Sequence, residues 1–321
     1  MTIAPAEWAP QRAMFTAFPS DPELWEGDLH PARAEVAAFV TQLADTVRVK
    51  LLASGELALA AAKDAVRHAN VDILDVPFGD IWVRDTAPIF LTAALGAAFR
   101  FNGWGGKYVL TNDEGVWARV ADAAGATVVP HDFVLEGGAI DGDGLGLFVT
   151  TEQCLLNANR NPDLGRREIE LALAQALGAR RVLWLGDGLV GDHTDGHVDN
   201  LARFVAPGTL MIPVSAGADD PNAAIFADAR ARARDGGCVV LDMPSVGRFM
   251  DTGDVRPASY MNFVIANGQV IVPLYGVAND AAALQAVRHA FPRHRVTGLP
   301  ATHILTGGGS FHCITQQQPE A

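Results

Sequence analysis

Five polar, glycine-rich clusters punctuate this chain of 321 residues, at unequal but similar intervals. The clusters lie near residues 80–88, 136–144, 192–199, 251–262 and 307–313. Between them, pairs of short apolar runs alternate with single segments of helical periodicity. This arrangement is typical of a repeated supersecondary unit placed around a centre. It predicts an α/β fold of ββαβ-like repeats, with the polar clusters at corresponding ends of the repeats.

Apolar residues at helical spacing predict six helices, the first beginning at Pro31, because proline is common at the first helical position. These helices span residues 31–47, 56–69, 114–125, 165–178, 221–233 and 280–291. Apolar runs between turn residues predict strands within residues 49–54, 143–156, 180–185, 201–215, 238–243 and 262–275. No linker and no charge block divides the chain, so we expect residues 1–321 to form a single domain.

The composition, with 49% hydrophobic and 19% charged residues, is that of a globular protein. The net charge of −13 argues against a sequence-independent nucleic-acid binder, which needs a basic face. The longest uncharged run, residues 261–279, is broken by Asn267-Gly268 and Pro273. We interpret it as two strands joined by a tight turn, and we expect no membrane segment.

The N-terminus lacks a basic start followed by an apolar run, so no signal peptide is expected. The three cysteines, Cys154, Cys238 and Cys313, are odd in number and widely spaced. Free thiols in a reducing compartment are therefore expected, which indicates a cytoplasmic protein.

The first two clusters are ambiguous when each is considered by itself. Trp82, Arg84 and Asp85 precede a proline and are typical of a polar loop that enters a strand. Glu136 precedes two glycines, which admit positive φ and close backbone approach, so its carboxylate could be aimed into a site. A charged turn between strands is the alternative. Cys154 lies in an apolar run and is expected to be an inert, buried thiol in a strand.

The third cluster places His193, Asp195, His197 and Asp199 at alternating positions. In an extended segment all four would point to one face. A solvated strand face is the simpler interpretation, but such faces more often carry lysine, glutamate or threonine. The cluster fits either a metal site or a general acid–base histidine beside a carboxylate. His197 and Asp199 are the strongest functional candidates.

The chain ends with three glycines, residues 307–309, followed by His312 and Cys313. Adjacent residues of a strand point to opposite faces, so His312 is a poor base for the Cys313 thiol. His197 is the best available partner, because a thiol nucleophile and its histidine are usually brought together by the fold. The glycines would let the backbone turn tightly into a pocket. The alternative is a terminal strand with a buried cysteine.

If the clusters converge, one pocket holds Asp85, Glu136, His197, Asp199 and Cys313. Three carboxylates and a thiol suit a planar cation with many N–H donors, such as a guanidinium group. The sulfur would attack the central carbon of that group. The histidine would protonate the departing ammonia and then activate a water that releases a urea. The carboxylates supply the electrostatics, so no metal is needed.

The sequence resembles the agmatine deiminases of the guanidine-modifying (pentein) superfamily, which includes bacterial peptidylarginine-deiminase-like proteins. The resemblance runs over nearly the whole chain. It rests on five stretches in the family's order: "WVRDTAP", "FNGWGGKY", "EGGAIDGDG…TTEQCLLNANRNP", "GHVDN" and "GGGSFHCITQQQP". The resemblance implies a five-fold pseudosymmetric α/β propeller, no metal or organic cofactor, and a homo-oligomer.

The resemblance also implies roles for the pocket residues. Cys313 would be the nucleophile and His197 the acid–base. Asp85 and Asp199 would grip the guanidinium, and Glu136 would support the histidine or the substrate.

Trp82, Trp104 and Gly308 are assigned to substrate binding beside the two aspartates. Trp82 and the loop of Trp104, Gly105 and Gly106 would line the pocket, and Gly308 would border it. Ser310 stands where the family usually has asparagine, next to the nucleophile, so the substrate preference is in question more than the reaction. The expected reaction is agmatine plus water to N-carbamoylputrescine plus ammonia.

Three alternatives stay open. Free arginine or peptidyl arginine could replace agmatine, and its carboxylate should need an arginine partner, for which Arg84 and Arg256 are candidates. A metal-dependent hydrolase could use the His193, Asp195, His197 and Asp199 cluster. A protein that binds guanidines or polyamines without turnover could use the same scaffold.

Overall fold

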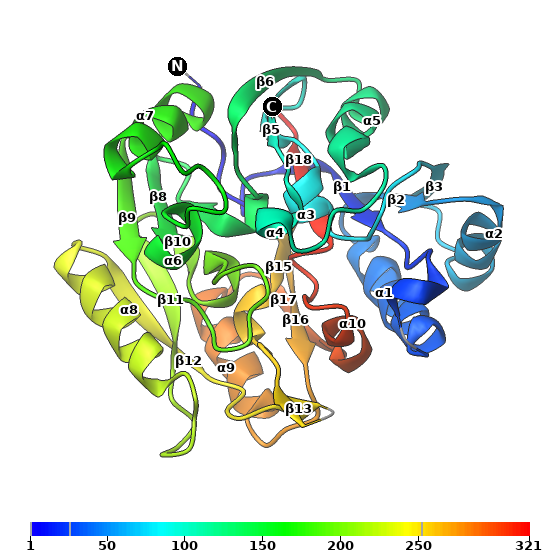
Figure 1. Ribbon diagram of the computed structural model, residues 1–321. Coiled ribbons are helices and arrows are strands. Elements are labelled where there is room, and N and C mark those ends of the chain that lie inside the picture. Colours follow the sequence, from blue (N-terminus) through cyan, green and yellow to red (C-terminus); the bar gives the residue numbers. More distant parts are fainter. Residues whose placement is uncertain (1, 26, 252) are drawn as a thin grey trace.

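The computed structural model describes residues 2–25, 27–251 and 253–321, and its sheets surround a common centre (Figure 1). Four successive stretches repeat one pattern: an antiparallel strand pair, a helix, and a third strand parallel to the second. The first is β4 (Ile89–Thr92), β5 (Leu95–Arg100), α5 (Val116–Ala124) and β6 (Thr127–Val134). The second is β7 (Ile140–Gly142), β8 (Leu147–Thr151), α7 (Arg166–Leu177) and β9 (Arg181–Leu185). The third is β10 (Arg203–Ala206), β11 (Thr209–Val214), α8 (Ala223–Asp235) and β12 (Val239–Pro244). The fourth is β15 (Val264–Ala266), β16 (Gln269–Leu274), α9 (Asp280–Ala290) and β17 (Arg295–Pro300).

The fifth repeat joins the two ends of the chain. The last strand, β18 (Thr315–Pro319), pairs antiparallel with the first, β1 (Gln11–Ala17). Then come α1 (Leu29–Leu43) and β2 (Arg48–Ala53), which runs parallel to β1. A further helix and strand, α2 (Glu56–Ala65) and β3 (Val71–Asp75), extend this sheet to four strands. The expected α/β propeller of five ββαβ repeats is confirmed.

Short elements connect the repeats. The helical ones are η1 (Pro22–Leu24), α3 (Val83–Thr86), α4 (Gly103–Gly106), η2 (Asp113–Gly115), η3 (Gly137–Ala139), α6 (Glu152–Leu155), η4 (Val198–Asn200), η5 (Tyr260–Asn262) and α10 (Thr302–Thr306). A two-stranded ribbon consists of β13 (Met250–Asp251) and β14 (Asp254–Val255). Four of the helical turns, α3, η3, η4 and η5, directly precede the first strand of a repeat.

The long helices lie on the outside of the ring and the strands lie within it (Figure 1). Strands β15 and β16 are buried over almost their whole length, whereas α9 buries only Ala283 and Val287. A helix with one apolar stripe covers one face of its sheet, and the strand interiors fill the core. The Asn267-Gly268 pair joins β15 to β16, as the sequence predicted. Among the described residues, no helix is both long and apolar enough to cross a bilayer.

Two local predictions were wrong. Helix α1 begins at Leu29, and Pro31 lies inside its first turn, where the missing N–H costs no hydrogen bond. Residues 152–155 form the helix α6 rather than the end of a strand. The Thr151 side chain accepts a hydrogen bond from the Cys154 amide at 3.2 Å and caps this helix. Cys154 is thus buried in a helix, not in a strand.

Candidate active site

The polar clusters of the sequence are the turns that start each repeat, and these turns meet at the centre of the ring. They are α3, η3, η4, η5 and the turn at residues 311–314, which precedes β18. Each contributes at least one residue to the centre: Asp85, Gly138, Asp199, Asn262 and Cys313 in that order. The five-fold repeat therefore gathers side chains that are far apart in the sequence.

Hydrogen bonds link neighbouring turns around this centre. The Arg84 amide donates to the Cys313 carbonyl at 3.1 Å, and the Gly138 amide donates to Asp85 Oδ1 at 2.9 Å. Asn262 donates from Nδ2 to Cys313 Sγ at 3.2 Å. Because each contact joins two repeats, the geometry of the centre depends on the closed ring.

Cys313 lies in a turn, not in the strand that the sequence predicted. Cys313 is 7% exposed and lines the pocket, and its Sγ lies 3.6 Å from Asp199 Oδ2. The Asn262 side chain fixes this turn, because its Oδ1 accepts from the amides of His312 at 2.9 Å and Cys313 at 3.2 Å. Burial and the charges of Asp199 and Asp85 raise the pKa of the Cys313 thiol well above its usual value. The thiol is therefore protonated in the free protein at neutral pH.

Gly308 borders the same pocket and has a φ of +107°, which side-chain-bearing residues rarely adopt. The expected tight turn at the terminal glycines is confirmed at this residue. The glycines after Glu136 act differently. Neither Gly137 nor Gly138 has positive φ, but a Cβ on Gly138 would lie 2.5 Å from His197 Nδ1. The absence of a side chain there makes room for the histidine ring.

His197 is fully buried at the N-cap of η4, and neither of its ring nitrogens has a hydrogen-bond partner within the described residues. Its Nδ1 lies 3.8 Å from Asp85 Oδ2. Burial lowers the pKa of His197, but the charges of Asp85 and Glu136 and the contact with Cys154 outweigh it and raise the pKa well above its usual value. The surroundings of His197 therefore favour its protonated form, which faces Asp85 and Cys154.

Asp85 and Asp199 are buried, and each is held by a hydrogen bond from a different ring side chain. Asp85 Oδ2 accepts from Trp104 Nε1 at 2.9 Å, and burial together with the Asp199 and Glu136 charges raises the Asp85 pKa. Asp199 Oδ2 accepts from His312 Nδ1 at 2.8 Å. Burial raises the Asp199 pKa, but this hydrogen bond and the His312 charge outweigh it, so that the net pKa lies below the usual value.

His312, whose role the sequence left open, lies behind Asp199 and away from the pocket. Its Nε2 lies 2.9 Å from Glu7 Oε2 and its Nδ1 lies 2.8 Å from Asp199 Oδ2, so the ring bridges two buried carboxylates. Glu7 also accepts from the Ile265 amide at 2.6 Å and pairs with Arg203. Glu7 was not among the predicted site residues, because its partner His312 lies 305 positions away in the chain and no local pattern connects the two.

Glu136 is fully buried and accepts from Arg160 Nε at 2.8 Å. Arg160 also donates to Asp195 and, at 2.7 Å, to the Thr194 carbonyl. Arg160 was likewise missed, although it belongs to the "NANRNP" stretch. The sequence showed only an arginine within a polar stretch. Its burial, which requires a charged partner, became visible in the structure.

The segment from His193 to Asp199 is not extended, so the prediction of one shared face was wrong. Residues 193–196 form turns, and Asp195 has a φ of +63°. His193 is exposed and contacts Tyr108, whose hydroxyl lies 2.7 Å from its Nδ1. Asp195 binds Lys107 and Arg160 instead. The four side chains do not converge, and the metal site proposed for them has no support.

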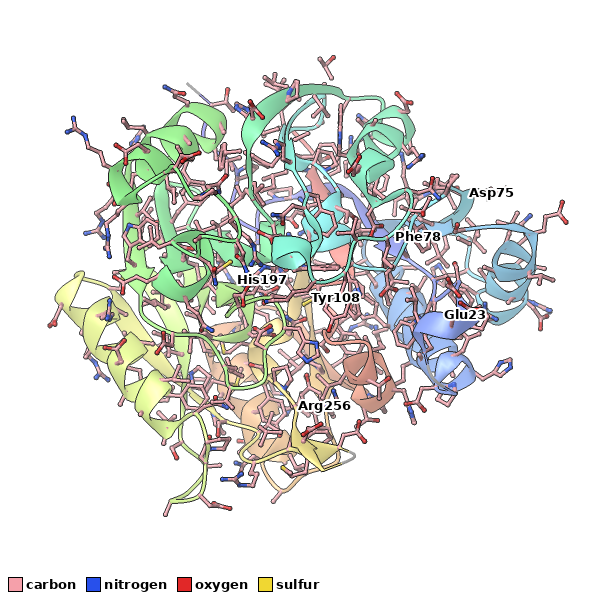
Figure 2. The ribbon with its side chains drawn as sticks, viewed as in Figure 1. Glu23, Asp75, Phe78, Tyr108, His197 and Arg256 are labelled. Carbon is pink, nitrogen blue, oxygen red and sulfur yellow. The ribbon has the colours of Figure 1, made fainter. Side chains whose placement is uncertain are left out.

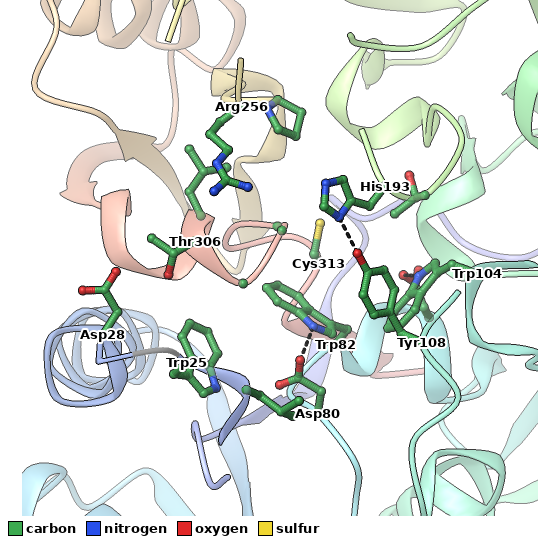
Figure 3. Close-up of a pocket in the computed structure, with 18 of the residues that line it drawn as sticks. Trp25, Asp28, Asp80, Trp82, Trp104, Tyr108, His193, Arg256, Thr306 and Cys313 are labelled. Atoms are coloured by element: carbon green, nitrogen blue, oxygen red, sulfur yellow. Dashed lines mark hydrogen bonds between the residues drawn. The ribbon is translucent and has the colours of Figure 1, made fainter. Parts of the chain in front are cut away.

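A pocket of about 430 Å³ opens above Cys313. Aromatic side chains form its walls, and Figure 3 shows Cys313 near its middle with Trp82, Tyr108 and Trp104 on one side. The backbone at Trp104 is strained, with a φ of +53°. The acidic lining residues are Asp28, Asp80, Asp85 and Asp251, and the aromatic ones are Trp25, Trp82, Trp104 and Tyr108.

Aspartates outnumber basic side chains among the described lining residues. Asp80 accepts from Trp82 Nε1 at 2.7 Å, which orients the indole, and burial raises the Asp80 pKa to about 7. Arg256 is the one arginine among the lining residues that the structure describes, and it lies 3.2 Å from Asp251 Oδ2. Figure 2 shows Arg256 well away from His197 and Tyr108, which lie near the middle of the molecule. Such a pocket suits an elongated cation better than an anion.

Arg84, the other candidate for binding a carboxylate, is not in this lining. It is buried and donates to Gln317 Oε1 at 2.9 Å and to the His312 carbonyl at 3.3 Å. It therefore supports the turn that carries Cys313, and it cannot bind the carboxylate of a substrate.

Comparisons with known proteins agree on one family. The model of the Porphyromonas-type peptidyl-arginine deiminase family matches residues 3–319. An agmatine deiminase of Stutzerimonas stutzeri is 38% identical over 98% of this chain and 95% of its own, and one of Pseudomonas aeruginosa is 36% identical over the same shares. The solved structure of an agmatine deiminase of Enterococcus faecalis superposes with a TM-score of 0.92 at 30% identity, covering 99% of this chain and 96% of its own.

Proposed function

Since the chain belongs to the Porphyromonas-type peptidyl-arginine deiminase family, we propose that it hydrolyses agmatine to N-carbamoylputrescine and ammonia. The observation that carries the proposal is the Cys313 thiol at a predominantly acidic pocket, within 3.6 Å of Asp199. Relatives named agmatine deiminase that align over nearly the full length support the same substrate.

The guanidinium group binds first, between the carboxylates of Asp85 and Asp199. One oxygen of each carboxylate is hydrogen-bonded to the protein. Asp85 is bonded to Trp104 and Asp199 to His312, so both carboxylates are fixed before the substrate arrives. Prepositioned acceptors are suited to the planar fork of a guanidinium group. Trp82 offers an aromatic wall to the alkyl chain, and the acidic lining residues favour its terminal ammonium.

Binding of the cation also activates the nucleophile. The negative groups that raise the Cys313 pKa are neutralised by the guanidinium, so the thiol loses its proton as the substrate binds. The thiolate attacks the central carbon and forms a tetrahedral adduct. His197 then donates a proton to one nitrogen, the C–N bond breaks, and ammonia leaves. The product of this half-reaction is a thiouronium on Cys313.

Hydrolysis reverses the role of the histidine. His197, now neutral, takes a proton from a water that attacks the thiouronium carbon, and the C–S bond breaks. The sulfur leaves as the thiolate and regains its proton, which gives a urea and the free enzyme. Glu136, held by Arg160, keeps a negative charge beside the histidine and stabilises its protonated form.

A second candidate keeps the reaction and changes the substrate to arginine or peptidyl arginine. Arg256 favours it, because this side chain lines the pocket and could bind an α-carboxylate. Its pairing with Asp251 favours agmatine instead, since that pairing neutralises the cation.

The direct test is product identification after incubation with agmatine, arginine and a short peptide with a C-terminal arginine. We expect N-carbamoylputrescine and ammonia from agmatine, with the highest kcat/KM of the three. The Cys313→Ala variant should remain folded and release no ammonia. Turnover of arginine at a higher kcat/KM, lost in Arg256→Ala, would assign the second candidate.

We further propose a single catalytic domain, acting in the cytoplasm as a homo-oligomer. The ring closure between β1 and β18 supports the first statement, and the free cysteines support a reducing compartment. The oligomer rests on the resemblance, and sedimentation of the purified protein tests it.

A further inference from the structure

We propose that Glu136, Cys154 and His197 form a buried site for a thiophilic divalent cation such as Zn²⁺, which inhibits the enzyme reversibly by occupying its histidine. A carboxylate oxygen, a thiol sulfur and a ring nitrogen, one from each residue, lie within 4.8 Å of one another. Glu136 is the N-cap of η3, Cys154 lies in α6, and His197 is the N-cap of η4. The inference rests on the proposed function, because it concerns control of that same site.

The ligand atoms are available to a metal. Glu136 Oε2 and both ring nitrogens of His197 are buried without a hydrogen-bond partner among the described residues. Glu136 Oε1 already binds Arg160, which orients the carboxylate and leaves the second oxygen unused. Buried polar atoms normally have partners, so unused lone pairs around one point indicate a group that can enter.

The chemistry of the ligand set fits zinc rather than calcium or magnesium. Zinc binds thiolate sulfur, imidazole nitrogen and carboxylate oxygen, and it accepts three protein ligands with a water in the fourth position. Calcium and magnesium prefer oxygen ligands throughout. On binding, the Cys154 thiol and the protonated His197 each release a proton to solvent, so the site becomes a thiolate, a carboxylate and a neutral imidazole.

Occupation of the site would stop the proposed reaction without touching Cys313. A metal-bound His197 nitrogen cannot donate a proton to the leaving amino group of the adduct or take one from water. All three ligand residues are fully buried and none of them lines the pocket, but His197 Nδ1 lies 3.8 Å from Asp85 Oδ2, and Asp85 does line it, so we expect the ion to enter from the pocket side. Bound agmatine therefore protects the enzyme, and removal of the metal by a chelator restores it.

Metal binding can be measured on a protein that does not turn over. The Cys313→Ala variant removes the thiol that faces the pocket and leaves the cluster intact. We expect it to bind one equivalent of Co²⁺ with a sulfur-to-cobalt charge-transfer absorption, displaced by Zn²⁺. The double variant Cys313→Ala/Cys154→Ser should lack that absorption, while Cys313→Ala/Cys238→Ser, the matched loss of a cysteine elsewhere, should keep it. Because no activity is read, the outcome is independent of the proposed function.

Inhibition by zinc is measured on the wild-type enzyme and on Cys154→Ser. The Zn²⁺ concentration for half inhibition of ammonia release should rise at least about tenfold in Cys154→Ser. If the Cys154 variants do not fold, zinc-edge X-ray absorption of Cys313→Ala should still show one sulfur among the ligands. Absence of sulfur ligation in Cys313→Ala, or metal that binds wild type and not Cys313→Ala, would overturn the proposal and place the metal on the nucleophile.

Discussion

At the scale of the residue, the thiol of Cys313 is surrounded by groups that oppose its ionisation. It is buried beside Asp199 and near Asp85, and the hydrogen bonds from the Ser310 backbone and the Asn262 side chain do not outweigh these effects on its pKa. An isolated cysteine in this position would be a poor nucleophile. In the proposed reaction, its ionisation therefore depends on the positive charge of the substrate. Removal of a neighbouring carboxylate should make the thiol react faster with an alkylating agent and yet turn over agmatine more slowly.

The Asp199→Asn variant tests this separation. With one negative charge removed, the Cys313 pKa should fall, and the thiolate fraction at neutral pH should rise roughly tenfold or more. We expect faster alkylation by iodoacetamide at pH 7, measured by mass spectrometry of the Cys313 peptide. Agmatine turnover should fall in the same variant. Slower alkylation than in wild type would show that the thiol is already ionised at rest.

His312 lowers the pKa of Asp199, and the His312→Gln variant should show this effect in the pH dependence of kcat/KM. The Asp199 pKa lies below its usual value, so the charged carboxylate is lost as the pH falls through that low value. Without the His312 charge this pKa rises, and the acid limb of kcat/KM should move to higher pH. His289→Gln, an exposed histidine on α9, is the control and should leave the limb unchanged. An unshifted acid limb in a folded His312→Gln protein would contradict this role.

The sequence predicted residue types better than contacts. Cys313, His197, Asp85, Asp199 and Glu136 were chosen from their chemistry, and the structure places them around one centre. Their supports were not predictable in the same way. Each supporting contact joins segments far apart in the chain, and neither periodicity nor composition reports such contacts.

At the scale of the element, the short turns before the strands determine the site. The sequence marked them as polar clusters, but it misjudged two of them as extended, at residues 193–199 and 311–314. Alternation of polar residues fits a strand as well as a sequence of turns, and tertiary contacts decide between them. Asn262 shows the consequence, because its turn was noted while its contacts with the Cys313 turn were not foreseen.

Asn262→Ala should weaken both the turn and the reaction. The amides of His312 and Cys313 lose their acceptor, and each buried unsatisfied group costs about 1–3 kcal/mol. We expect a lower free energy of unfolding by denaturant titration and a lower kcat for agmatine. Asn279→Ala, which removes a 2.8 Å bond to the Ser245 carbonyl outside the site, is the matched control. Equal kcat values for the two variants would argue against a role of Asn262 in the site.

At the scale of the whole molecule, the ring is closed by its two ends. Pairs such as Phe15 with Gln316 join β1 to β18, so the last strand completes the sheet that the first strand begins. The sequence predicted repeats from its punctuation, and the number five came from the resemblance. The sequence pattern could not give the register between the ends, because no local signal connects them.

Deletion of residues 315–321 tests this closure while it keeps Cys313. Strand β1 would lose its antiparallel partner, and Arg84 would lose its contact with Gln317. We expect the Tm to fall by roughly 5 °C or more, with loss of activity, in thermal unfolding followed by circular dichroism. Removal of Ala321 alone should have a small effect. A truncated protein with native Tm and activity would show that the ring does not need its last strand.

In the proposed reaction, Cys313 forms a covalent adduct with the guanidinium carbon of agmatine and ammonia leaves. Mass spectrometry of enzyme quenched in acid during turnover tests it most directly. We expect a peptide containing Cys313 that is heavier by the mass of agmatine less ammonia, and no such peptide in Cys313→Ala. An adduct on another residue, or steady release of N-carbamoylputrescine by Cys313→Ala, would contradict it.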